Sequence, residues 1–182
     1  MNSEKFREKY EPLLLEVITP RYVWKMCNVG ANLVFARNEN AANGHIQDIG
    51  QTQGLPLQGE DIKKHLQGCD EIILLAVTIG LQVDELIHRT EAADMSGAVV
   101  LDALASIAVE RLCDEAIKKI QLSTVNCQLS TRYSPGYGDF PLEVQSEILA
   151  ILDAKKKIGL YVNESNLLIP RKSITAVIGV KK

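Results

Sequence analysis

The sequence predicts an α+β fold in which a mostly antiparallel sheet is flanked by helices. The apolar run 72–77 lies between Gly68 and Gly80, which is typical of a strand covered on both faces. A second segment, 94–120, carries apolar residues and many alanines at helical spacing, so it predicts a long helix packed closely on that sheet. The expected helices and strands lack the regular alternation of a doubly wound sheet, which favours antiparallel pairing.

Composition limits the classes of function. The chain has 182 residues, of which 46% are hydrophobic and 24% charged, so it can bury one good core and is predicted to form a single domain over 1–182. Its formal net charge of -3 leaves no basic footprint for nucleic acid or an anionic membrane surface. The N-terminal residues are charged where a signal peptide would be apolar, and no apolar run reaches the roughly 20 residues that span a bilayer. We therefore expect a cytoplasmic protein with neither nucleic acid nor membrane as a partner.

The residues that commonly ligate metals are scattered. The four cysteines are Cys27, Cys69, Cys113 and Cys127. Because none of them forms a C-x-x-C pair, we expect reduced thiols, most of them small core residues, and neither a disulfide framework nor a zinc site. His65 and His88 are expected on the surfaces of helices.

The N-terminal half is predicted to begin with a helix and a strand. Apolar residues recur at helical spacing over 3–17, Ser3 is the expected N-cap, and Pro20 ends the pattern. Residues 21–29 alternate and are rich in β-formers, which predicts a strand. The further expected elements of this half are a loop over 36–44, a short strand over 45–49, a flexible stretch over 50–54, a short apolar segment over 55–57 and a short helix over 60–66.

The C-terminal half is expected to contain the central strand and the long helix. Asp94 is the expected cap of the long helix, and Pro141 suits the first turn of a later one. The expected elements are a strand over 71–78, helices over 83–89 and 94–120, a strand over 122–129, a helix over 142–154, and strands over 160–162 and 174–180.

Two short patterns are excluded as sites. Gly54 and Gly59 have the spacing of the two glycines in a phosphate-binding loop. However, Glu60 and Asp61 stand where that loop needs Lys and Ser or Thr, and carboxylates would repel phosphates. His45 lacks the flanking residues of the D-x-H-x-x-G motif with which corrinoid-carrying proteins ligate cobalt.

The segment 132–141 is the strongest candidate for a binding loop, and it reads Arg-Tyr-Ser-Pro-Gly-Tyr-Gly-Asp-Phe-Pro. Gly136 and Gly138 accept positive φ and leave room for backbone amides to approach a ligand closely. Arg132 presents a fork suited to one carboxylate, and Tyr137 offers an aromatic face to a flat ring or a cation. The alternative is an ordinary turn rich in Pro and Gly with an exposed arginine.

Three blocks of the sequence carry a resemblance to a known family. They are 76–81 followed by Asp94, then 132–138, which matches an R-x-x-x-G-Y signature for S-adenosylmethionine, and finally 158–175. Together they cover roughly residues 70–178 in the order of the family and at similar spacing. The chain resembles the activation domain of cobalamin-dependent methionine synthase in its small free-standing form, and the resemblance implies the same α+β fold.

The resemblance also implies a function. When the cobalt of methionine synthase is oxidised, the family's domain binds S-adenosylmethionine over the corrin, a flavodoxin-like donor supplies an electron, and the methyl group restores the active methylated cobalt. The chain is thus expected to be an accessory activation subunit that is inactive alone. Its partner would be the corrinoid-binding subunit or domain of methionine synthase, which carries the cobalamin.

The family's binding residues can be matched to positions here. Arg132 would hold the methionyl carboxylate, the backbone around Ser134 and Gly136 would line the ligand, and Tyr137 would pack against it. The family also uses a glutamate on the helix before the loop, for which Glu110 is the candidate and a solvated helix glutamate the alternative. The implied ligand-binding residues are Arg132, Tyr133, Ser134, Pro135, Gly136, Tyr137, Gly138 and Glu110.

Two departures from the family bear on this pocket. Its paired tyrosines follow the third block and have no counterpart before Lys182, so we expect the adenosine side of the pocket to be incomplete. An aspartate from the family's N-terminal region also lacks a match. We therefore expect weak binding unless a partner completes the site.

Two other functions compete with this one. The chain could instead activate, or bind S-adenosylmethionine for, another corrinoid methyltransferase system. A self-sufficient S-adenosylmethionine-dependent methyltransferase is disfavoured, because no glycine-rich loop with a downstream acidic residue follows a first strand.

Overall fold

The computed structural model describes residues 3–28, 59–124 and 126–182. Four strands form an antiparallel sheet in the order β1-β2-β6-β3, and two further strands, β4 and β5, form a small hairpin sheet. Their bounds are β1 Arg21–Asn28, β2 Glu71–Thr78, β3 Gln128–Leu129, β4 Tyr161–Val162, β5 Leu168–Ile169 and β6 Ser173–Lys181. The predicted antiparallel α+β architecture is confirmed.

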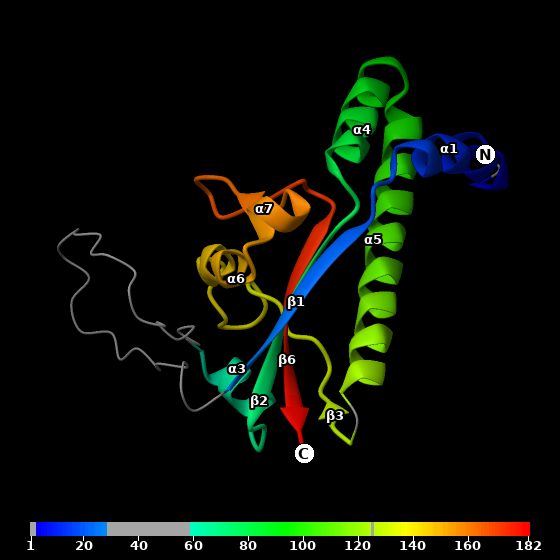
Figure 1. The fold of residues 1–182 in the computed structure, drawn as a ribbon. Helices are drawn as coiled ribbons and strands as arrows, with labels where there is room; N and C mark the ends of the chain where they lie inside the picture. Colours follow the sequence, from blue (N-terminus) through cyan, green and yellow to red (C-terminus); the bar gives the residue numbers. More distant parts are fainter. Residues whose placement is uncertain (1–2, 29–58, 125) are drawn as a thin grey trace.

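Helices cover both faces of the larger sheet (Figure 1). Their bounds are α1 Ser3–Val17, α3 Glu60–His65, α4 Leu81–Ala93, α5 Met95–Ser123, α6 Val144–Leu152 and α7 Ala154–Ile158. The helices α1, α4 and α5 pack on one face, and α3, α6 and α7 pack on the other. The sheet therefore separates two hydrophobic cores.

The central strand β2 explains why its sequence is continuously apolar. Ile72, Leu74 and Ala76 enter the core under α6, whereas the alternate residues Ile73 and Leu75 enter the core under α5. All of these side chains are fully buried. A strand with alternating residues in two cores has no face left for polar residues, as the sequence predicted.

The long helix α5 begins at the expected cap. The Asp94 carboxylate accepts a hydrogen bond from the backbone N–H of Gly97 at 2.9 Å, which satisfies one of the free amides of the first turn. The hydroxyl of Tyr10 on α1 donates to the same carboxylate at 2.5 Å. A Cβ on Gly97 would overlap the Tyr10 ring, so the glycine lets α1 dock against the start of α5.

The strand predicted over 122–129 is wrong in most of its length. Helix α5 continues to Ser123, and the amide of Thr124 still donates to the carbonyl of Ile120 at 3.0 Å. Leu122 remains 80% exposed on this last turn, so its apolar side chain signals neither a strand nor a core position. Only Gln128–Leu129 then pair, at the far end of β6.

Other boundaries differ by smaller amounts. The helix predicted over 83–89 is longer, since α4 spans Leu81–Ala93. The helix predicted over 142–154 begins later, at Val144, after a turn at Leu142 and Glu143 that Pro141 precedes. Asp153 in left-handed conformation separates α6 from α7. Strand β5 was not predicted. The expectations for 36–57 fall outside the described residues.

The state of the cysteines and the apolar character of the helices bear on two expectations from the sequence. All four cysteines are free; Cys69 and Cys113 are buried, whereas Cys27 and Cys127 are partly exposed. Within 3–28, 59–124 and 126–182, no helix combines the length and apolar character needed to cross a membrane.

Candidate functional site

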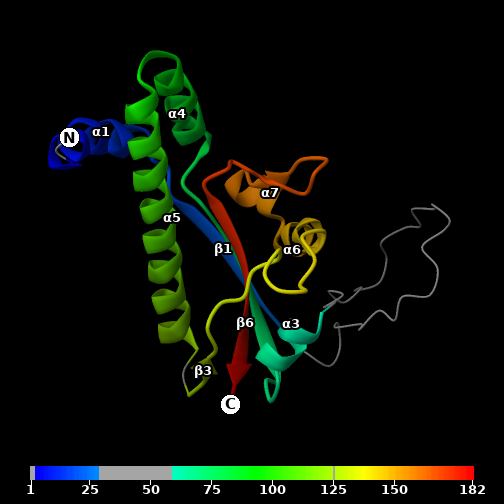
Figure 2. The same ribbon diagram turned by 180° about the vertical axis from the view of Figure 1, so that it is seen from behind.

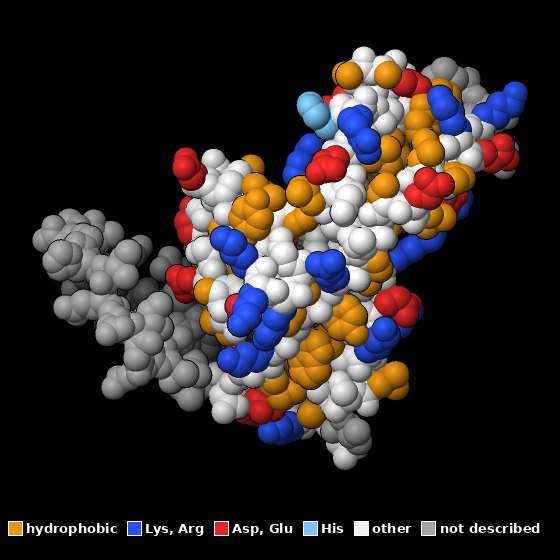
Figure 3. All heavy atoms as spheres, turned by 45° about the horizontal axis from the view of Figure 1, so that its top comes forward, with side chains coloured by type: hydrophobic (Ala, Val, Ile, Leu, Met, Phe, Trp, Pro, Cys, Tyr) orange, Lys and Arg blue, Asp and Glu red, His pale blue; other side chains and the backbone are white. Residues whose placement is uncertain are grey.

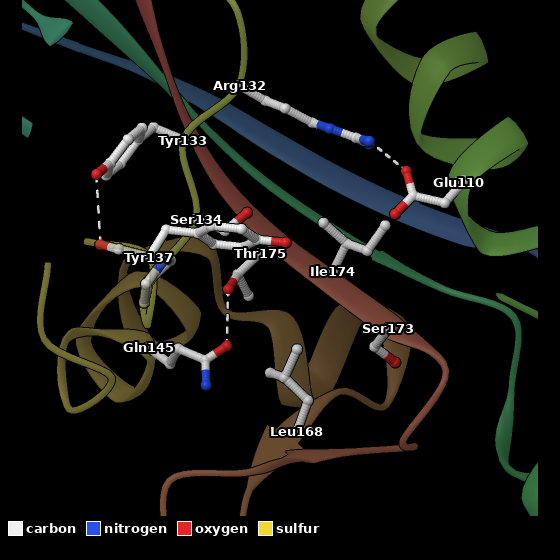
Figure 4. A pocket seen from close by; sticks show the side chains of 11 residues that line it. Glu110, Arg132, Tyr133, Ser134, Tyr137, Gln145, Leu168, Ser173, Ile174 and Thr175 are labelled. Carbon is white, nitrogen blue, oxygen red and sulfur yellow. Dashed lines mark hydrogen bonds and ion pairs between the residues drawn. The ribbon is translucent and has the colours of Figure 1, made fainter.

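A pocket of about 450 Å³ lies beside the first half of β6, between α5, the 132–137 segment and α6 (Figure 4). The segment between β3 and α6 runs along β6 (Figure 2) and forms one wall of the pocket. The pocket is lined by Glu110, Arg132, Tyr133, Ser134, Pro135, Tyr137, Gln145, Leu168, Ser173, Ile174 and Thr175. Most of the residues matched from the family thus meet in one cavity, whereas Gly136 and Gly138 do not line it.

Arg132 and Glu110 both line this pocket, and their side chains point toward one another (Figure 4). Glu110 comes from the middle of α5 and Arg132 from the segment after β3, and their side chains form an ion pair. The second terminal nitrogen of the guanidinium, Nη1, is buried and has no hydrogen-bond partner. The fork of Arg132 therefore keeps a donor free for a further acceptor.

The guanidinium of Arg132 stays protonated and positively charged. Burial alone would lower the pKa of its guanidinium, but the hydrogen bond with Glu110 and the neighbouring Cys113 raise that pKa above its ordinary value. Burial also raises the pKa of the Cys113 thiol, which stays neutral beside the arginine. The pocket thus presents one fixed positive charge and one carboxylate, an arrangement suited to a ligand that carries both charges.

The turn after Arg132 uses its glycines for its own geometry. The amide of Gly136 donates to the carbonyl of Phe140 at 2.8 Å, and the amide of Phe140 donates to the carbonyl of Tyr137 at 3.0 Å. The Gly136 amide is therefore occupied within the turn. This differs from the expectation that it would face a ligand, because a tight turn satisfies its own amides first.

Gly138 lets the turn lie against α3. Its φ is +56°, and a Cβ there would collide with the Asp61 carboxylate and lie 2.7 Å from the Tyr133 hydroxyl. The next residue, Asp139, accepts hydrogen bonds from the backbone amides of Glu60 and Asp61 at 2.6 and 3.1 Å. These two hydrogen bonds hold the pKa of the Asp139 carboxyl below its usual range, and the bond from the Glu60 amide has the larger effect. Gly138 therefore lets the turn beside the pocket pack closely against α3.

The two tyrosines of the turn have different environments. Tyr133 is half-buried, and its ring packs between His65 and Phe140 at centroid distances of 5.1 and 6.1 Å. Tyr137 is 68% exposed and extends over the pocket (Figure 4). Tyr133 thus serves as a wall, and Tyr137 as an open aromatic face at the rim.

His65 was expected at the surface, and it is only partly exposed there. The residue is half-buried, and its Nε2 lies 2.7 Å from the carbonyl oxygen of Thr131 and 3.0 Å from Oγ of Ser130. It supports the segment that leads into Arg132, which the helical spacing of 60–66 alone did not reveal. His88 is exposed, as expected.

The edge of β6 is a part of the site that sequence reasoning missed. Tyr133 and Val177 exchange both backbone hydrogen bonds, at 2.8 and 2.9 Å, on the edge of β6 that faces away from β2. Backbone polar groups of a strand alternate between its two edges, so those of Thr175 point the same way as those of Val177. In the described part of the chain no strand pairs with this half of that edge, so the N–H and C=O of Thr175 face the pocket.

Five lining residues were not predicted as binding residues: Gln145, Leu168, Ser173, Ile174 and Thr175. Polar residues in apolar patterns could have indicated three of them. Thr175 and Gln145 are buried, and the Thr175 hydroxyl donates to the Gln145 side-chain oxygen at 2.9 Å. Ser173 is the first residue of β6, a mostly apolar strand. Nothing in the sequence distinguishes Leu168 and Ile174 from core residues.

The structure is thus an α+β fold with a pocket at an open sheet edge. No protein-family model and no curated protein matches the sequence. Among solved structures, the chain is similar to the crystal structure of the MetH reactivation domain bound to AdoHcy, with a TM-score of 0.60 and 20% identity. The match covers 97% of this chain and 65% of that one. The chain therefore has the fold of the MetH reactivation domain, as its resemblance implied, and spans about 65% of that structure's length.

Proposed function

We propose that the chain binds S-adenosylmethionine in the pocket of Arg132 and Glu110 and presents it to cobalamin carried by a partner chain. In this role it would be an activation subunit for cobalamin-dependent methionine synthase. The observation that carries the proposal is the ion pair of Arg132 and Glu110 that lines an open pocket, within a fold shared with a domain bound to AdoHcy.

The ion pair suits the amino-acid end of this ligand. An amino-acid zwitterion offers a carboxylate to the Arg132 fork and an ammonium to the Glu110 carboxylate. Each partner of the ion pair then gains an oppositely charged ligand group. Nη1 of Arg132, which has no partner among the described residues, adds a donor for the ligand carboxylate. Part of the binding free energy is used to separate the ion pair, which is partly exposed and therefore weak.

The other end of the ligand would lie along β6. Backbone donors and acceptors at the open edge near Thr175 suit the polar edge of a nucleoside, and Tyr137 offers an aromatic face at the rim. The pocket volume of about 450 Å³ falls in the range of small-molecule sites. These features support binding of an adenosyl group without the paired tyrosines of the family.

The chemistry would be divided between two chains. S-adenosylmethionine supplies a methyl group and leaves as the neutral thioether S-adenosylhomocysteine, while the partner's cobalamin accepts the methyl group after gaining one electron from a flavodoxin-like donor. This chain holds the amino-acid group with Arg132 and Glu110 and orients the methyl group toward the opening. Across the described ranges no cluster of His, Cys, Asp or Glu could hold a metal ion, so none of these side chains is assigned a role in cobalt ligation.

Two further points belong to the proposal. We infer that 1–182 act as one domain, because the two cores rest on opposite faces of the same sheet. We also place the reaction in the cytoplasm, where a reduced flavodoxin-like donor would be available.

Calorimetry with matched ligands tests the binding step. S-adenosylmethionine should bind, and its decarboxylated analogue should bind at least tenfold more weakly because it cannot use the Arg132 fork. At a hundredfold excess over its dissociation constant, S-adenosylmethionine should also stabilise the fold by about 2.7 kcal/mol. Equal affinity for both ligands would refute the assigned orientation. Repeating the titration with the corrinoid subunit of methionine synthase, and with another corrinoid methyltransferase protein, decides between the two possible partners.

A further inference from the structure

A group of unpaired cations lies at the edge of the sheet opposite the pocket. Lys155, Lys156 and Lys157 project from α7, and Arg21 and Lys25 project from β1, against which α7 packs. All five side chains are exposed. We call them the basic surface. Among the described residues none of them has an ion-pair partner, although Lys155 lies over the Tyr161 ring at 5.6 Å.

Some of the cations on other faces are paired with carboxylates. Arg7, Lys118 and Lys172 each form an ion pair with a carboxylate at 2.7 to 2.8 Å. Figure 3 shows Lys and Arg side chains gathered on one part of the surface, beside hydrophobic side chains. The basic surface is therefore a local excess of positive charge on a chain whose formal net charge is -3.

Aromatic side chains accompany this charge. Tyr161 is 41% exposed next to Lys155. Trp24 precedes Lys25 on the edge strand β1 and is half-buried, with its ring on the α5 face of the sheet. Aromatic residues are enriched at protein interfaces, and complementary charges across an interface steer and orient the two partners. The two features together indicate a docking surface.

The docking surface and the pocket can be occupied together. The strand order β1-β2-β6-β3 puts β1 at one edge of the sheet, whereas the pocket uses the open half of β6 on the other side of β2. A molecule on the basic surface would not cover Arg132 or Glu110.

We propose that the basic surface docks a second protein through a carboxylate-rich face. A nucleic-acid site would require a basic domain, and this chain has a pI near 5.7. A membrane surface usually binds an amphipathic helix that inserts its apolar side, whereas α7 has only five residues and buries its apolar residues Ala154 and Ile158 in the fold. A protein with clustered carboxylates fits the charge, the aromatic side chains and the small area. This inference does not depend on the ligand of the pocket.

Trp24 provides a local readout, because it is the only tryptophan of the sequence. The experiment titrates the full chain with a fluorescein-labelled poly-L-glutamate peptide and follows both peptide anisotropy and Trp24 emission. The test variant exchanges Lys155, Lys156 and Lys157 for Glu. A control variant carries Lys5→Glu, Lys64→Glu and Lys181→Glu, which change three exposed lysines elsewhere and give the same net charge.

We expect saturable binding that shifts Trp24 emission and weakens as salt shortens the screening length. The test variant should lose at least tenfold in affinity, and the control variant should stay within about twofold of the parent, since only nearby charges act across a screened distance. Circular dichroism and thermal unfolding of both variants show whether they fold alike. Equal losses in both variants, or no binding at low salt, would overturn the proposal. Tighter binding to an oligonucleotide or to phosphatidylglycerol vesicles through the same lysines would replace the protein partner with those ligands.

Discussion

Exchange of Arg132 for lysine tests how the pocket recognises its ligand. In the structure one terminal nitrogen of the guanidinium pairs with Glu110 and the other is buried without a partner. Lysine offers a single ammonium, which cannot serve Glu110 and a ligand carboxylate in the same fork geometry. Loss of one charge-assisted hydrogen bond corresponds to about 1.5 to 3 kcal/mol, or roughly a 10- to 150-fold weaker affinity for S-adenosylmethionine.

Calorimetry of the Arg132→Lys variant measures this loss, with Arg111→Lys as the matched control. Arg111 is exposed, sits next to Glu110 on α5 and does not line the pocket. Thermal unfolding should change little in either variant, because the pair of Arg132 and Glu110 is partly exposed and contributes at most about 1 kcal/mol. An Arg132→Lys variant that binds as tightly as the parent would refute the role given to the fork.

Three further predictions concern the scaffold. Gly138→Ala should destabilise the fold by about 1 to 3 kcal/mol more than Gly159→Ala, as measured by urea unfolding. Both glycines have positive φ, but only at Gly138 would an added Cβ meet close neighbours. Equal destabilisation by the two substitutions would contradict this packing. Gly97→Ala should cost about 1 to 3 kcal/mol by pushing α1 off α5, whereas Ser96→Ala on the same exposed turn should be nearly neutral; a silent Gly97→Ala would exclude that contact. The Asp94 carboxyl has its pKa lowered by Tyr10 and then by the Gly97 amide, so its contribution is present above its unfolded pKa of about 3.9 and is lost as pH falls through the lower folded value. Thermal unfolding of Asp94→Asn against pH should lack this loss, and a profile parallel to that of the parent would argue against it.

Much of the fold could be predicted because local patterns and tertiary structure agree. The run 72–77 is apolar at every position, and the structure gives it a core on each face. Asp94 precedes the periodic segment and caps α5 as expected. Where they disagree, tertiary structure decides. Residues 122–129 resemble a strand, but α5 continues through Ser123 and β6 offers only Gln128–Leu129 a pairing partner.

The candidate site was likewise predicted in part, where local sequence features mark its residues, and missed where tertiary structure brings residues together. Arg132 and Tyr137 stand out in the sequence because glycine and proline surround them. The resemblance suggested Glu110 as a binding residue, but its ion pair with Arg132 was not predicted, because that pairing depends on how α5 crosses the sheet. The open edge near Thr175 depends on the strand order, because any strand beside that half of β6 would have closed it.

Methyl transfer to cobalt tests the central claim most directly. The purified chain is mixed with oxidised corrinoid protein, a reductant and methyl-labelled S-adenosylmethionine, while the cobalt absorption spectrum and the label on cobalamin are followed. The proposal predicts conversion to methylcobalamin that requires both the chain and the corrinoid protein, and that slows with Arg132→Lys but not with Arg111→Lys. Conversion at the same rate without this chain would contradict the activation role, and conversion of free cobalamin by this chain alone would contradict its dependence on a partner.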